Sequence, residues 1–371
     1  MIPLIVDLET EWRGGQSQAL LLLEGLYERG HAAELLTARG SPLGRRARRA
    51  GIYVHEVSPA MLRLAAARKI RSLLSDGRFD LLHANEAHAL TAAWLAGAHR
   101  QLPLLSSRRI GFPLQRNWIS RARFRALDRF VANSRDVARS LVESGFPADR
   151  IAIVNEGVEI PDRVSTLQRN AARKRWGVAQ GEFLFGCASA FVPEKGQRHV
   201  VEALRIVRER FPHTRVLLAG EGSCLDDVRH LAARLDLQQA VLLPGFVTDM
   251  PEFYAALDAF VFPSEFEGLG TALQAAMAYG LPVISTTRGA LGEVVEDGRT
   301  AIVAEPDAMS FATAMAGLVG DAALQKRLGE AGRIEVIERF SADRMVANTL
   351  AVYEELSGTG AAANAPGTNL T

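Results

Sequence analysis

Short apolar segments with strand-like patterning alternate with helix-forming segments along almost the whole chain. The first apolar segment spans Ile2 to Asp7, and similar segments recur as far as residues 283–285. Parallel strands joined by helices produce this alternation, because the chain must cross back over the sheet before each new strand begins. The pattern therefore predicts an α/β fold built on doubly wound parallel sheets.

The alternation lapses once, around residues 161–168, where polar residues replace the apolar pattern. A chain of 371 residues is long enough for two domains of ordinary size. We expect an N-terminal domain over residues 1–162 and a C-terminal domain over residues 163–340. A last helix over 341–357 and a tail over 358–371, predicted to be disordered from its composition, complete the chain.

The segment 262–280 carries the strongest functional pattern. An apolar run is followed by Glu267, a Gly-Leu-Gly loop and helix-forming residues from Thr271 onward. This order predicts a strand, a tight loop and a helix N-terminus. Such a helix start offers free N–H groups and a positive dipole end to an anion. A carboxylate beside it can accept hydrogen bonds from sugar hydroxyls, so a sugar carried on a pyrophosphate fits both features.

With these residues the segment resembles the donor-sugar signature of retaining glycosyltransferases of family 4, which have the GT-B fold of two Rossmann-like domains facing across a cleft. The resemblance extends over roughly residues 3–357 and is most specific over 183–298. It implies transfer of a sugar, with retention, from a nucleotide-diphosphate sugar to a glycan or glycolipid acceptor. It also implies catalysis without a metal and a last helix that packs back on the first domain.

The resemblance implies roles for individual residues. Glu267 would orient the sugar, Lys195 would hold the pyrophosphate, and His88 would touch the acceptor or the transferred sugar; these three are the candidate catalytic residues. Each surrounding loop is also compatible with a plain strand-to-helix turn. The candidate donor-binding residues are Gly14, Gly15, Lys195, Arg198, Gly245, Phe246, Glu267, Gly268, Leu269, Gly270 and Thr271.

Two positions depart from the family pattern. Ala190 stands where the family usually has an arginine, and Ala275 stands where it has a second glutamate. Arg198, one helical turn after Lys195, is the candidate replacement for the missing charge. The departures leave a differently held donor, a divergent subgroup and a loss of activity as alternatives. The alternative functions are a non-catalytic partner that binds a sugar nucleotide or glycolipid, and a GT-B sugar-nucleotide epimerase.

Arginines and aromatic residues interleave between residues 108 and 125. Residues 1–165 carry 24 basic and 17 acidic side chains, against 19 and 25 in the remainder, so the first half is the positive one. The stretch predicts an acceptor face or a contact with an anionic membrane, although a solvated helix face gives the same pattern and no nucleic-acid motif accompanies it. This face comprises Arg108, Arg109, Arg116, Trp118, Arg121, Arg123 and Arg125.

The cysteines and the apolar runs bear on metal binding and on the cellular location. Cys187 and Cys224 lack metal-ligand spacing, so we expect no metal site and no cofactor beyond the nucleotide sugar as co-substrate. No apolar run reaches the roughly 18 residues of a membrane span, and the N-terminus lacks a signal pattern. We expect a cytoplasmic protein, free or peripheral on the inner membrane face, acting in lipopolysaccharide or cell-envelope polysaccharide synthesis.

Overall fold

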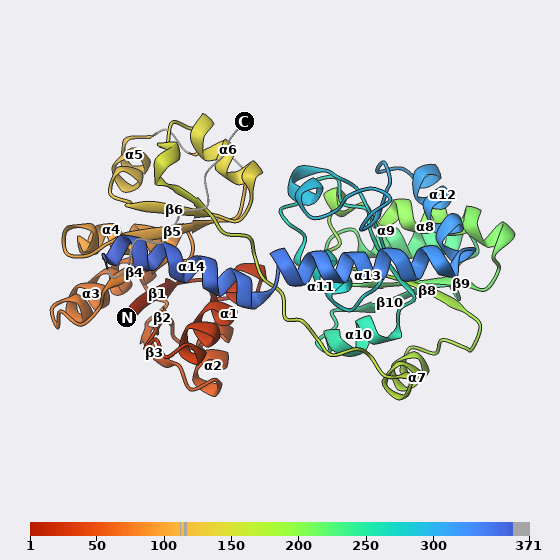
Figure 1. Cartoon of the computed structure of the whole chain (residues 1–371), viewed down its shortest axis with the longest axis horizontal. Coiled ribbons are helices and arrows are strands. Elements are labelled where there is room, and N and C mark those ends of the chain that lie inside the picture. The colour runs from red at the N-terminus through yellow and green to blue at the C-terminus, as the bar shows by residue number, and fades with distance from the viewer. Residues whose placement is uncertain (112, 115–116, 359–371) are drawn as a thin grey trace. The chain divides into compact units, whose positions relative to one another are not determined.

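The computed structural model describes residues 1–111, 113–114 and 117–358, which divide into two compact units (Figure 1). Unit 1 comprises Met1–Gly157 and the chain from Ala342 onward, and unit 2 comprises Val158–Ser341. The first boundary therefore falls after Gly157 and not after residue 162. It does so because Val158 already pairs with Ser341 and packs in the core of unit 2.

Unit 1 is built on a seven-stranded parallel sheet with the order β3-β2-β1-β4-β5-β6-β7. The strands are β1 (Pro3–Asp7), β2 (Glu34–Ala38), β3 (Tyr53–Val57), β4 (Leu81–Ala84), β5 (Leu104–Arg108), β6 (Arg129–Ala132) and β7 (Ile151–Ile153). The helices are α1 (Gly14–Glu28), α2 (Pro42–Arg49), α3 (Leu62–Leu74), α4 (Ala87–Ala96), α5 (Trp118–Arg125), α6 (Arg135–Glu143) and α14 (Ala342–Ser357).

Successive residues of a strand in this sheet enter different cores. Leu4 and Val6 of β1 pack with residues of α3 and α4, whereas Ile5 packs with residues of α1, α2 and α14. A parallel sheet is apolar on both faces and needs this cover on each. The C-terminal helix α14 is thus part of the core of unit 1, where the Tyr353 side chain is fully buried.

Unit 2 has a six-stranded parallel sheet with the order β10-β9-β8-β11-β12-β13. The strands are β8 (Phe183–Ala188), β9 (Thr214–Ala219), β10 (Val241–Gly245), β11 (Ala259–Phe262), β12 (Val283–Ser285) and β13 (Ile302–Val303). The helices are α7 (Thr166–Arg175), α8 (Gln197–Arg210), α9 (Leu225–Arg234), α10 (Met250–Ala256), α11 (Thr271–Ala278), α12 (Ala308–Val319) and α13 (Ala322–Arg339).

The predicted fold class, α/β with two doubly wound parallel sheets, is confirmed. The expected polar linker over 161–168 is partly helical, because Ser165 and Gln168 form a capping box that starts α7. The two-residue strand β13 was not predicted, since two residues are too few to show a pattern. The tail predicted to be disordered lies, beyond residue 358, outside the described residues.

Candidate functional site

Two of the predicted catalytic residues contact each other in unit 2. Lys195 ends the short 3-10 helix η3 (Pro193–Lys195), and Glu267 lies in the loop between β11 and α11. Nζ of Lys195 donates a hydrogen bond to Oε2 of Glu267, and each side chain is only 18% exposed. Both loops follow the carboxyl ends of strands, where parallel α/β sheets bind their ligands.

Backbone contacts hold the loop that carries Glu267. The N–H of Glu265 donates to the carbonyl oxygen of Glu194 at 2.8 Å, and Oγ of Ser264 donates to the same oxygen at 3.3 Å. Gly289 has a φ of 64°, and a Cβ atom there would lie 2.1 Å from the carbonyl oxygen of Glu267. Since only glycine fits this close approach, Gly289 fixes the backbone of Glu267.

Helix α11 begins directly after this loop. Gly270 is its N-cap, with a φ of 66° and, among the described residues, no side chain that caps the helix. The N–H groups at the start of α11, from Thr271, are therefore the groups that an anion would meet. The N–H of Gly268 donates to Oε1 of Glu267 at 3.2 Å. Leu269 differs from the others, because its buried side chain packs in the core and leaves only its backbone for a ligand.

The residues beside the two departures from the family pattern differ in exposure and contacts, and the role of Arg198 as a donor-binding residue stays a prediction. Arg198 is exposed on α8 and makes no hydrogen bond or ion pair with other described residues. The adjacent Gln197 turns toward the loop instead, and its Nε2 donates to the carbonyl oxygen of Ala190 at 2.9 Å. Gln274, beside Ala275, is fully buried with neither amide atom partnered among the described residues, so it does not replace the missing glutamate.

The predicted nucleotide-base segment follows β10. Gly245 ends that strand with a φ of 78°, and the side chain of Phe246 is 64% exposed. An exposed aromatic ring beside a strand end is a suitable surface for stacking a base. Its role as a donor-binding residue stays a prediction.

In unit 1 the predicted glycines Gly14 and Gly15 begin helix α1, and a buried polar network fixes this helix start. Oδ2 of Asp7 accepts hydrogen bonds from Gln16 at 2.9 Å and from Nδ2 of Asn85 at 2.6 Å. The same Asn85 nitrogen donates to the carbonyl oxygen of Gly15 at 3.1 Å. These contacts tie the start of α1 to the ends of β1 and β4, which keeps this helix start in one conformation. The role of Gly14 and Gly15 as donor-binding residues stays a prediction.

Arg109 belongs to this network and not to the surface predicted for it. Its guanidinium donates to the carbonyl oxygen and to Oδ1 of Asn85, at 2.8 and 2.7 Å, and pairs with Glu156 at 3.0 Å. These contacts engage Nε and both terminal nitrogens of the guanidinium group inside the unit. The prediction that Arg109 contacts an acceptor or a membrane is therefore corrected to a structural role.

Sequence patterns missed Glu86, which lies beside the predicted catalytic residue His88. Glu86 caps α4 and accepts hydrogen bonds from the N–H of Ala89, at 2.6 Å, and from the N–H of His88. Burial raises the pKa of Glu86 to about 7, and the negative charge of Asp7 adds to the increase. Ligand atoms of Glu9, Glu86 and His88 lie within 4.8 Å of one another, a grouping that their sequence spacing does not reveal.

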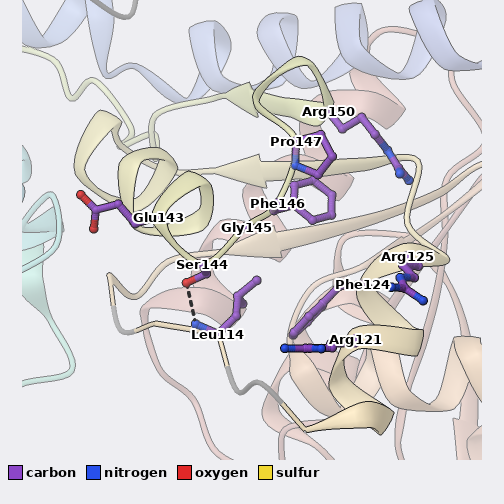
Figure 2. Close-up of a pocket in the computed structure, with 10 residues that line it drawn as sticks. All are labelled: Leu114, Arg121, Phe124, Arg125, Glu143, Ser144, Gly145, Phe146, Pro147 and Arg150. Atoms are coloured by element: carbon purple, nitrogen blue, oxygen red, sulfur yellow. Dashed lines mark hydrogen bonds between the residues drawn. The ribbon is translucent and has the colours of Figure 1, made fainter.

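The remaining predicted arginines line two neighbouring pockets of unit 1. The strand-end pocket, of about 560 Å³, contains His88, Arg63, Arg108 and Arg123, and none of the described residues lining it is acidic. The α5 pocket, of about 470 Å³, contains Arg121 and Arg125 (Figure 2). The Trp118 side chain on the same helix is 74% exposed. Arg116, which was predicted to share this face, lies outside the described residues.

Comparison with known proteins decides the family. The model described as "Glycosyl transferases group 1" matches residues 168–335, and the model described as "Glycosyltransferase Family 4" matches residues 12–160. The chain belongs to the family 4 glycosyltransferases. This glycosyltransferase carries the Lys195–Glu267 pair in the first region. The second region contains Asn85 and Arg109 of the polar network, and their partner Asp7 lies just before that region begins.

The relatives of this glycosyltransferase include D-inositol 3-phosphate glycosyltransferase of Nocardia farcinica, 33% identical over 68% of this chain and 56% of that protein. N-acetyl-alpha-D-glucosaminyl L-malate synthase of Bacillus anthracis is 26% identical over 89% of this chain and 91% of that protein. The chain thus spans little more than half the length of some relatives and most of others.

Solved structures support the predicted GT-B fold of this glycosyltransferase. HepE of Anabaena, in complex with UDP and glucose, matches with a TM-score of 0.81 and 20% identity over 95% of this chain and 99% of that one. The GT-B fold prediction is confirmed at the level of architecture. Among the described residues, none of the helices combines the length and the apolar character that crossing a membrane requires.

Proposed function

We propose that this glycosyltransferase moves a sugar from a nucleotide-diphosphate sugar to a glycan or glycolipid acceptor, with retention of anomeric configuration. The observation that carries the proposal is the Lys195–Glu267 pair at the start of α11, where a cation, a carboxylate and free helix N–H groups meet. HepE of Anabaena, which shares the fold and was solved in complex with UDP and glucose, supports a donor of this class.

The proposed reaction breaks the bond between the sugar C1 and the diphosphate oxygen and forms a bond from C1 to the acceptor oxygen on the same face. The acceptor proton passes to the departing diphosphate oxygen, so no base in the protein is needed. Negative charge develops on the diphosphate, and Lys195 with the N–H groups from Thr271 would stabilise it electrostatically. Glu267 would orient the sugar hydroxyls. The nucleotide sugar serves as co-substrate, and we propose no further cofactor and no catalytic metal.

For the acceptor we propose a molecule that carries phosphate or carboxylate. The strand-end pocket supports this, because His88, Arg63, Arg108 and Arg123 line it without an acidic residue among the described ones. Two relatives are named for acceptors of this chemistry, D-inositol 3-phosphate and L-malate. We propose His88 as the acceptor contact, and synthesis of lipopolysaccharide or another envelope glycan at the cytoplasmic membrane face as the setting.

A non-catalytic role is the second candidate, and the alanines at 190 and 275 favour it. In such a protein a sugar nucleotide would bind without transfer. The two candidates differ in one observable, which is formation of the nucleoside diphosphate product in the presence of an acceptor.

The test measures thermal shifts with UDP-, GDP- and ADP-sugars and with each free diphosphate, followed by turnover with the donor that binds. We expect Lys195→Ala to weaken diphosphate binding about 10- to 100-fold, as loss of a charged contact of about 1.5–3 kcal/mol predicts. Glu267→Gln should retain diphosphate binding, because it frees Lys195, but should lower turnover about 100-fold or more. Lys174→Ala, an exposed lysine on α7, is the matched control.

Binding of a sugar nucleotide without any diphosphate release would favour the non-catalytic candidate. Turnover that survives Glu267→Gln unchanged would contradict the proposed orientation of the sugar. No shift with any of the donors would contradict a donor site at α11.

A further inference from the structure

Helix α5 presents an unusual combination of side chains on one face. The helix contains three arginines and no acidic residue. Trp118, Arg121 and Arg125 follow one another at intervals of three and four residues, which places them on the same side of the helix. The third arginine, Arg123, points elsewhere and donates to Ser120 and Thr91.

Arg121 and Arg125 are exposed arginines without a partner among the described residues. Neither makes a hydrogen bond or an ion pair with any residue in the part of the chain that the structure describes, and both are exposed. Like charges four residues apart on a helix repel each other. Among the described residues nothing forms an ion pair with either guanidinium group, and an external anion would compensate for their charge.

The pocket beside these arginines combines charge with apolar surface. Figure 2 shows Arg121, Arg125 and Arg150 beside the rings of Phe124 and Phe146, with Glu143 apart from them and pointing away. Leu114 adds to the apolar lining, and its N–H donates to Oγ of Ser144 at 2.9 Å, which fixes that wall. A ligand that fits must present an anionic group next to an apolar portion.

Exposed apolar side chains continue the same surface outward. The side chain of Trp118 is 74% exposed and that of its neighbour Ile119 is 42% exposed. Tryptophan is favoured at the boundary between lipid headgroups and acyl chains, since its ring is apolar and its N–H is polar. Arginine next to it recognises phosphate with two parallel hydrogen bonds. A small soluble anion would use the arginines and leave the exposed indole without a function.

We propose that the α5 pocket binds the phosphate headgroup of an anionic phospholipid while Trp118 enters the membrane interface. Arg121 and Arg125 contact the phosphate, and the rings of Phe124 and Phe146 lie along the glycerol and the first methylene groups. This site adjoins the strand-end pocket proposed for the acceptor, because Leu114 and Phe124 line both, but the two pockets have different arginines. The inference goes beyond the proposed function, since it requires neither a donor nor turnover.

The test is co-sedimentation of the full chain with phosphatidylcholine vesicles that contain or lack phosphatidylglycerol. We expect binding only to the anionic vesicles. Arg121→Gln/Arg125→Gln should reduce the partition coefficient about 30-fold, which corresponds to about 1 kcal/mol for each basic residue near an anionic surface. Trp118→Ala should also weaken binding while the net charge stays the same.

The matched control is Arg49→Gln/Arg68→Gln, which removes two exposed arginines from α2 and α3 of the same unit. This variant should bind the vesicles almost as well as the unchanged protein. Equal loss in the two double variants would show diffuse attraction by net charge and would overturn the site. Absence of binding to anionic vesicles would overturn it as well. Soluble glycerol 3-phosphate could also bind saturably without inhibiting the binding of vesicles. That result would identify a soluble-anion site and overturn the phospholipid site. Thermal denaturation of each variant verifies that it is folded.

Discussion

Glu86 is a single residue whose pKa is shifted by the fold. Its pKa rises from 4.5 to about 7 on burial. Between these two values the folded protein keeps a proton that the unfolded chain has released, so the stability falls as the pH rises from about 4.5 to about 7 and is level above that. Glu86→Gln cannot ionise, and it should therefore gain stability relative to the unchanged protein between pH 5 and pH 8, by at most about 3 kcal/mol.

Urea denaturation at the two pH values measures this difference. Glu28→Gln, at an exposed position of α1, is the control and should change the stability equally at both. A Glu86→Gln effect that is also independent of pH would mean that the carboxyl group is not desolvated in solution.

Residues could be predicted from the sequence where their role follows from a local pattern. Glu267 and Lys195 each stand in a loop directly after a strand, and the structure brings them into contact across 72 positions. Arg109 and Glu86 could not be assigned in this way. The direction of Arg109 depends on Asn85, and the burial of Glu86 depends on the loop after β1, including the N–H of Leu8, 78 positions away. No short-range pattern encodes either environment.

At the scale of elements, α14 is joined to the sheet of unit 1 by a buried polar contact. The hydroxyl of Tyr353 lies 2.6 Å from Nδ1 of His83, whose Nε2 lies 2.8 Å from Oγ of Ser107. Burial lowers the pKa of His83 to about 3, so the ring is neutral near pH 7. Tyr353→Phe leaves a buried ring nitrogen without its partner and should destabilise the protein by about 1–3 kcal/mol.

Denaturant unfolding at pH 7 tests this contact. Tyr27→Phe removes a hydroxyl from a side chain that is 58% exposed and should leave the stability unchanged. If Tyr353→Phe unfolds at the same denaturant concentration as the unchanged protein, the hydrogen bond to His83 contributes nothing to the docking of α14.

The existence of the long elements was predictable from their periodicity, whereas the packing of the last helix on the first domain was expected only from the resemblance to the family. The helix over 342–357 follows from its apolar periodicity, but nothing in that periodicity says which surface covers it. The sequence feature that reflects this contact lies in α1, where a Cβ atom on Gly25 would be 2.5 Å from Cγ2 of Val346. A glycine in mid-helix normally reduces helix stability, so its presence indicates close packing, but only the structure identifies the partner.

At the scale of the whole molecule, two domains were predictable from two series of alternating strands and helices. The alternation alone did not give their exact composition, because unit 1 takes its last helix from the far end of the chain, which was expected only from the resemblance to the family. Unit 2 is continuous in sequence and holds its own two apolar clusters. The two units should therefore differ in their ability to fold as separate fragments.

We expect residues 158–341 alone to unfold in one cooperative thermal transition and residues 1–157 alone to show none. Without α14, the fragment 1–157 lacks the buried side chains of Met345, Val346, Val352 and Tyr353. Each such side chain contributes about 1.5–3 kcal/mol, so their sum rivals the whole stability of a domain.

A Cβ atom on Gly157 would lie 2.7 Å from Cα of Ala342, so a short Gly/Ser linker can fuse 342–357 to the fragment. Circular dichroism during heating should show that this fusion restores the transition. A fragment 1–157 that unfolds cooperatively at the temperature of the fusion would show that α14 is dispensable for the core.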